Sequence, residues 1–311
     1  MTSPLLSLPG AVAGGGVDAP VAAHYGSFYG EQRTLESGEG FVDLSHHDVV
    51  RISGPDRLQW LHDLTTQHFL DLPARTWTQA LVLSPKGHVE HAFAGLDDGD
   101  SFTAATEPGR AAALVDFLDR MRFMSRVEVA DVTAELALTY RPSADKSGGH
   151  ELIPREKLTT YAEAAGPACG LWAYEALRIA RGEPRLGLDT DDRTIPNEVG
   201  WIGTAVHMDK GCYRGQETVA RVHNLGRPPR RLTLLHLDGS ENRLPAVGAS
   251  LTQDGKAVGF VGTSARHHEL GPIALALVKR NVPLDAQLSV DDLPAAQEAI
   301  VDPEVGLHFR R

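Results

Sequence analysis

The sequence has few cysteines and no long apolar run. Cys169 and Cys212 are the only two cysteines among 311 residues. Two cysteines make no disulfide framework, which fits a reducing compartment. Two thiols also fall short of the four thiolates that hold a four-iron cluster, so a permanent cluster carrier is not expected. No apolar run reaches the roughly 18 residues of a membrane helix. We therefore expect a cytoplasmic protein without a membrane partner.

Basic residues are also in deficit. The chain has 30 Lys and Arg against 41 Asp and Glu, a formal net charge of -11 at pH 7. Binding to a nucleic-acid backbone requires Lys and Arg that neutralise phosphates, so direct nucleic-acid binding is not expected outside a local basic patch. The first twenty residues have no basic segment ahead of an apolar core, which argues against a signal peptide. We interpret residues 1–22 as a flexible leader.

What the sequence does contain is a dense group of reactive side chains around Cys212. Lys210 and Arg214 flank the thiol, and nearby positive charge favours the thiolate, the form that reacts or binds metal. Gly215 allows a sharp turn. A helix from about Gln216 would direct its positive end toward the sulfur. We predict that Cys212 and Lys210 act in the chemistry of this protein; the alternative is a surface turn with an incidental cysteine.

Residues 210–217, Lys-Gly-Cys-Tyr-Arg-Gly-Gln-Glu, resemble the signature of the YgfZ/GcvT family of folate-binding proteins, and specifically its YgfZ branch. That branch supports iron–sulfur cluster assembly and repair and is linked to tRNA modification. The resemblance implies tetrahydrofolate, or a derivative of it, as the ligand. It implies iron–sulfur proteins or cluster-assembly factors as partners.

The order of the predicted elements indicates an α+β protein. A strand over residues 49–53, a helix after Pro55, a hairpin around residues 84–87 and a helix over residues 109–123 are typical of a split α/β sandwich. After Pro228, short strands separated by Gly and Pro favour a small β-barrel. The resemblance implies that these parts form the GcvT-like multi-domain fold.

This pattern divides the chain into three segments. The flexible leader is followed by a GcvT-like folate-binding region over residues 23–227, with a subdomain break near residues 143–150. The barrel domain covers residues 228–311. A helix begins at Leu171 and stops at Gly182. Cys169, just before Leu171, is expected to be a packed, inert thiol.

Several residues are candidates for contact with folate. The resemblance places Glu198 where a carboxylate holds the pterin, whose paired N–H donors a carboxylate can accept; a surface acid is the alternative. Trp172 offers an aromatic face, although a helix tryptophan more often lies in the core. Arg230 lies in a basic segment that could meet the glutamate tail, could contact tRNA phosphate, or could be ordinary surface charge.

Further candidates come from the loop and from the start of the chain. Tyr213 and Gln216 would shape the thiol loop on the folate side. His47 lies close to where related proteins line the folate pocket. No metal site is predicted. Strand alternation sends His88 and His91 to opposite faces, and histidines that are adjacent in the sequence diverge in the same way.

The rival hypothesis is a folate-dependent aminomethyltransferase-like one-carbon transferase. That branch carries an acidic pair after a Gly-Gly turn, where this chain has Glu90-His91-Ala92. Without the pair, proton transfer at the folate nitrogen loses its obvious agent, which disfavours glycine cleavage. A third hypothesis is a non-catalytic adaptor for tRNA-thiolating enzymes. Whether the protein catalyses a reaction stays open, and an assembly or repair factor is favoured over an enzyme.

Overall fold

The computed structural model describes residues 1–143 and 149–304. The centre of the predicted subdomain break, residues 144–148, lies outside the described residues. The chain forms two compact units and passes between them several times. The first unit comprises Met1–His62, Phe69–Gln79 and Ala92–Tyr174, and the second comprises Asp63–His68, Ala80–His91 and Glu175–Arg311.

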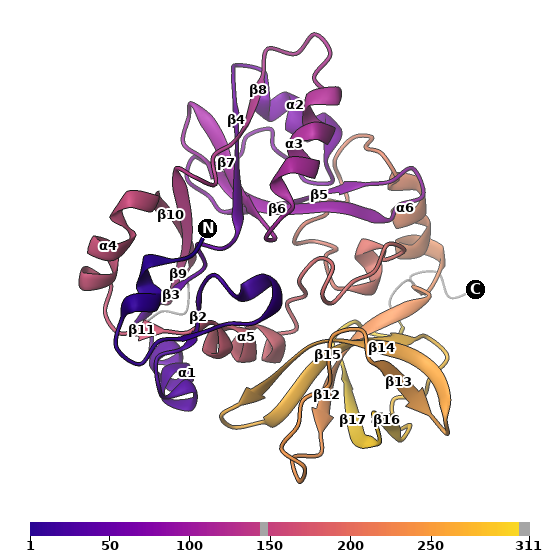
Figure 1. The fold of residues 1–311 in the computed structure, drawn as a ribbon. Helices are drawn as coiled ribbons and strands as arrows, with labels where there is room; N and C mark the ends of the chain where they lie inside the picture. The colour runs from indigo at the N-terminus through magenta and orange to yellow at the C-terminus, as the bar shows by residue number, and fades with distance from the viewer. Residues whose placement is uncertain (144–148, 305–311) are drawn as a thin grey trace. The chain divides into compact units, whose positions relative to one another are not determined.

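A five-stranded sheet has the order β5-β6-β7-β4-β8 (Figure 1). Its strands are β4 (Asp48–Ser53), β5 (Thr78–Leu83), β6 (Val89–Asp97), β7 (Ser101–Thr106) and β8 (Glu128–Asp131). Helix α2 (Arg57–Leu64) follows β4, and α3 (Ala111–Arg120) follows β7 and packs against β4 and β8. The apolar side chains Leu114, Phe117 and Leu118 of α3 are buried, because they recur at helical spacing on one face. The predicted hairpin and both predicted helices are confirmed.

A second sheet, within the first unit, has the order β10-β9-β3-β11. Its strands are β3 (Phe41–Asp43), β9 (Leu136–Arg141), β10 (Gly149–Pro154) and β11 (Ala168–Cys169). Helix α5 (Leu171–Ala180) follows β11, and Gly182, with φ 73°, comes just after its end, as predicted. Cys169 is buried, and this burial raises the pKa of its thiol to about 12. The prediction of a packed thiol is confirmed, and the raised pKa is consistent with an inert one.

The first residues do not form the expected flexible leader. A short 3-10 helix, η1 (Pro4–Ser7), buries Leu5 against Phe41 and Leu158. The Ser3 hydroxyl donates a hydrogen bond to Asp43, and β1 (Val12–Ala13) pairs with β2 (Ala22–His24). Burial of apolar surface at Leu5 offsets the entropy of ordering this stretch, which a Pro-, Gly- and Ala-rich composition does not reveal.

The C-terminal strands close into a barrel, so the predicted α+β class with a small β-barrel is confirmed (Figure 1). The strand order is β12-β15-β14-β13-β16-β17. The strands are β12 (Arg230–Leu237), β13 (Ser250–Gln253), β14 (Lys256–His267), β15 (Gly271–Lys279), β16 (Leu288–Val290) and β17 (Leu293–Ala299). Pairing of β17 with β12 completes the ring. The first strand begins close to the predicted domain boundary at residue 228.

The remaining elements include those that carry the candidate site. They are η2 (Gly16–Asp18), α1 (Phe28–Glu36), η3 (Arg155–Lys157), α4 (Leu158–Ala164), η4 (Pro196–Glu198) and α6 (Gln216–Leu225). Within the described part of the chain, every helix is too short or too polar to cross a membrane.

Candidate functional site

The thiol lies on an exposed loop of the second unit, directly before α6. Cys212 is a free, exposed cysteine. Gly215, with φ 80°, precedes the first residue of α6, so the predicted turn and helix are both present. A Cβ on Gly215 would lie 2.5 Å from the Ser84 carbonyl oxygen and 2.9 Å from the Gly87 Cα. The β5–β6 turn therefore packs backbone against backbone on the loop that carries the thiol.

This packing predicts that Gly215→Ala is harmful where Gly211→Ala is not. Alanine at position 215 combines a left-handed φ with a backbone clash, and we expect a stability loss of about 1–3 kcal/mol. Gly211 has open space around its Cβ position and needs no positive φ, so its replacement should change stability by less than about 0.5 kcal/mol. Urea denaturation of both variants measures the difference. Equal losses would show that the close contact does not hold the loop.

Lys210 is buried beneath this loop. Its Nζ donates a hydrogen bond to the Thr65 carbonyl oxygen at 2.5 Å and lies 5.2 Å from the centroid of the Tyr213 ring. Burial lowers the pKa of Lys210 to about 8, an effect that Asp63 opposes. Burial also raises the pKa of the Tyr213 hydroxyl to about 12, so Tyr213 stays neutral at physiological pH. The loop thus holds an amine that loses its proton far more readily than an exposed lysine.

The depressed pKa of Lys210 predicts a pH dependence of stability. The folded chain releases the Lys210 proton near pH 8, whereas the unfolded chain retains it up to about pH 10.5. The unfolded chain therefore binds more protons across this window, and the contribution of Lys210 to stability rises with pH. Lys210→Met should abolish that rise. Denaturant titrations of both proteins at neutral pH and near pH 10 measure it, and a stability difference that is independent of pH would contradict the prediction.

Arg214 forms an ion pair with Glu90 of β6 at 3.1 Å, with both side chains partly exposed. The two cations that the sequence places beside Cys212 thus have acceptors of their own, a carbonyl for Lys210 and a carboxylate for Arg214. Their stabilisation of a Cys212 thiolate stays a prediction. The same ion pair engages Glu90, the acid closest to the position of the missing acidic pair.

Glu198 and Arg230 form a cluster of charges with Asp191. The Arg230 guanidinium donates to both oxygens of Glu198, at 2.8 and 2.9 Å, and to both oxygens of Asp191, at 2.6 and 3.0 Å. Burial alone would raise the pKa of Asp191, but hydrogen bonds from Arg230 and Thr194 outweigh it and bring the pKa to about 2. Glu198 is fully buried and also accepts a hydrogen bond from the Ile195 N–H. This geometry indicates that Glu198 orients the Arg230 side chain.

The other predicted folate residues lie in different surroundings. Trp172, in the first unit, is 48% exposed, and its ring lies 5.1 Å from that of His24. His47, also in the first unit, has its Nδ1 3.0 Å from the Thr106 carbonyl oxygen. Gln216 is half-buried at the first position of α6. Tyr213, Gln216, Glu198 and Arg230 all belong to the second unit, together with Cys212.

Sequence reasoning missed the buried ion cluster around Arg178 of α5. Its guanidinium donates to Glu175 at 2.5 and 2.9 Å and to Asp189 at 3.2 Å. It also donates to the Thr263 hydroxyl of β14 at 2.6 Å, and a Cβ on Gly262 would lie only 2.2 Å from Asp189 Oδ1. The cluster ties the helix to the barrel strand. The sequence predicts the helix and its end at Gly182, but nothing in it indicates these partners.

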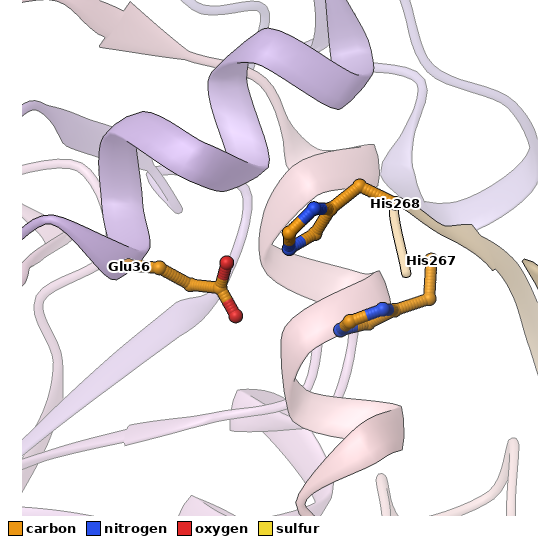
Figure 2. Close-up of side chains that lie close together, drawn as sticks. All are labelled: Glu36, His267 and His268. Carbon is orange, nitrogen blue, oxygen red and sulfur yellow. The ribbon is translucent and has the colours of Figure 1, made fainter. Parts of the chain in front are cut away.

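The two histidines at the end of β14 make defined contacts. The rings of His267 and His268 stack, with centroids 4.9 Å apart (Figure 2). His267 is buried, and its Nδ1 accepts hydrogen bonds from the Glu269 and Leu270 N–H groups. His267 therefore stabilises the turn between β14 and β15.

The fold is that of a known class of proteins. The glycine cleavage system aminomethyltransferase T from Bartonella henselae matches with a TM-score of 0.79 over 99% of this chain and 98% of its own, at 17% identity. At this identity the match establishes the fold alone. No protein-family model matches the chain.

Curated relatives are similar over much of the chain. They include a chloroplastic "Putative transferase" of Arabidopsis thaliana (25% identical, 72% of this chain) and an aminomethyltransferase of Nostoc sp. (34%, 82%). An iron–sulfur cluster assembly factor IBA57 homolog of Mycosarcoma maydis is 23% identical over 62% of this chain. The matches span 61%, 57% and 56% of these relatives' own lengths. The similarities support a place in the GcvT-like superfamily and do not single out its YgfZ branch.

Proposed function

We propose that this chain is a tetrahydrofolate-binding protein of the YgfZ type that acts in iron–sulfur cluster assembly or repair, and through it in tRNA modification. The observation that carries the proposal is Cys212, an exposed thiol in a loop held by the β5–β6 turn. An exposed sulfur can reach a cluster or a partner protein, whereas the buried Cys169 cannot. The similarity to an iron–sulfur cluster assembly factor homolog supports the same function.

The folate part of the proposal is supported by the GcvT-like fold and by the aminomethyltransferase relatives. Among the second-unit candidates, half-buried Gln216 retains an accessible surface at the start of α6. The carboxylate of Glu198 fits direct contact with a pterin poorly, because it is fully buried and bonded to Arg230. We therefore propose that Glu198 acts on the ligand through Arg230, whose side chain is partly exposed.

A titration of tetrahydrofolate, followed by intrinsic tryptophan fluorescence, tests the ligand. The chain has four tryptophans, and exposed Trp172 serves as a reporter. We expect a saturable change in the micromolar-to-millimolar range that weakens about tenfold or more in Arg230→Met, because charge-assisted bonds to the ligand or its carboxylate are lost. Arg227→Met, which removes a more exposed neighbouring cation paired with Glu304, is the matched control. A flat response to tetrahydrofolate would remove the ligand from the proposal.

The aminomethyltransferase relatives favour one-carbon transfer as a second candidate. Incubation with tetrahydrofolate and an aminomethyl donor distinguishes the two functions. Methylenetetrahydrofolate produced at a rate that depends on protein concentration would establish the transferase. We expect none, because Glu90, the acid near the required position, is paired with Arg214.

A further inference from the structure

The interior of the barrel contains a buried charge. Strand β12 lies between β15 and β17 in the closed ring (Figure 1). Side chains alternate along a strand, and the inward positions Leu235 and Leu237 of β12 belong to the barrel core. The same alternation directs Arg231 and Thr233 into the barrel, where the two residues are only 1% and 0% exposed. An arginine is almost never so fully buried without an acidic partner.

Neutral groups hold the Arg231 guanidinium. Its Nη1 donates to the carbonyl oxygens of Lys279 and Arg280, at 3.4 and 3.3 Å. Its Nη2 donates to the Val282 carbonyl oxygen at 2.9 Å and to Gln297 Oε1 at 2.8 Å. These acceptors carry no net charge, and no carboxylate of the described residues pairs with Arg231. Burial lowers the pKa of Arg231, yet a guanidinium stays protonated in proteins, so the positive charge remains.

Two hydrogen-bond donors in this part of the barrel have no partner among the described residues. They are the Arg231 Nε–H and the Thr233 hydroxyl, and both atoms are shielded from solvent. The two side chains are neighbours, because they lie two positions apart on one face of β12. Thr233 pairs in register with Ala276 of β15 and Ala299 of β17, whose methyl groups offer no acceptor. Buried donors rarely stay open, because each would lose the hydrogen bonds that it makes in water.

The charge and the open donors indicate the kind of ligand. A buried cation without an acidic partner favours an anion beside it, and two open donors suit an anion of one atom. A phosphate or sulfate would bring several oxygens, and those without a donor would lie against apolar core residues such as Leu235 and Val278. A water molecule meets the two donors but leaves the positive charge uncompensated.

We propose that the interior of the barrel binds a chloride ion, held between the Arg231 Nε–H and the Thr233 hydroxyl. The ion compensates the charge of Arg231 and so stabilises the part of the barrel where β12 begins. The preceding residue, Arg230, faces the other way and bonds to Glu198 and Asp191. Chloride is thus a structural ligand of the barrel, and the proposal does not depend on folate binding or on the exposed thiol.

Thermal unfolding of the full chain in chloride tests the proposal. Sodium gluconate is replaced stepwise by sodium chloride at constant ionic strength, so that screening stays the same. We expect the unfolding midpoint to rise with chloride concentration, because a ligand of the folded chain alone stabilises it. Thr233→Val should need about tenfold more chloride for the same rise, since a hydrogen bond to an anion is lost. Thr252→Val, whose hydroxyl already bonds to Ser289 at 2.9 Å, is the matched control and should respond as the wild type does.

A crystal of the wild-type chain grown in bromide locates the ion directly and keeps the test decisive if Thr233→Val fails to fold. We expect an anomalous difference peak within hydrogen-bonding distance of both Arg231 Nε and Thr233 Oγ1. A water molecule at this position, without anomalous signal, would overturn the proposal. So would an unfolding midpoint that does not rise with chloride, or a Thr233→Val variant that responds to chloride as strongly as the wild type.

Discussion

Cys212→Ser is expected to abolish support of iron–sulfur enzymes while leaving tetrahydrofolate affinity unchanged. A serine hydroxyl keeps the size of the side chain but does not ionise near neutral pH, and the thiolate is the form that binds iron or exchanges disulfides. We expect the recovery of an oxidant-inactivated four-iron dehydratase, in cells that lack the wild-type protein, to fall about tenfold or more. Because Cys212 is exposed, the substitution should leave the fold intact.

Cys169→Ala is the matched control for this experiment. Cys169 is buried, and its raised pKa keeps it a neutral thiol, so its removal should leave enzyme recovery unchanged. Full recovery with Cys212→Ser would mean that the sulfur is not used, and would favour the adaptor hypothesis. Loss of recovery together with loss of folate affinity would instead place Cys212 in the ligand site.

Arg178→Met is expected to be the most destabilising single substitution among those considered. It removes the buried cation that pairs with both Glu175 and Asp189 in a desolvated site, where Glu175 keeps a longer ion pair with Arg185, at 3.4 Å. Breaking a buried ion pair by removing one member costs about 3–5 kcal/mol. That is a large part of the total stability of a typical domain, so the urea midpoint should fall sharply.

Arg181→Met offers a control one helical turn away. Arg181 pairs with Glu183 at 2.7 Å, but both side chains are largely exposed, and such pairs contribute at most about 1 kcal/mol. Similar losses for the two variants would show that burial of the Arg178 cluster adds nothing to its strength.

Local sequence signals predicted most elements correctly, because they depend on neighbouring residues alone. Pro55 and the apolar spacing after it predict α2, and the turn at residues 84–87 predicts the β5–β6 hairpin. Local signals do not predict the last barrel strand. β17 reads Leu-Pro-Ala-Ala-Gln-Glu-Ala, a poor strand sequence, and only its pairing with β12 and β16 makes it a strand.

The sequence by itself determined the α+β class, the position of the barrel and the exposed thiol before α6, because turn residues and hydrophobic periodicity act over a few positions. Tertiary structure alone decided which charges meet. Glu198 is paired with Arg230, Lys210 with a carbonyl of residue 65, and Arg178 with Asp189. Packing between distant segments brings such partners together, and burial then sets the strength of their interactions and their pKa values.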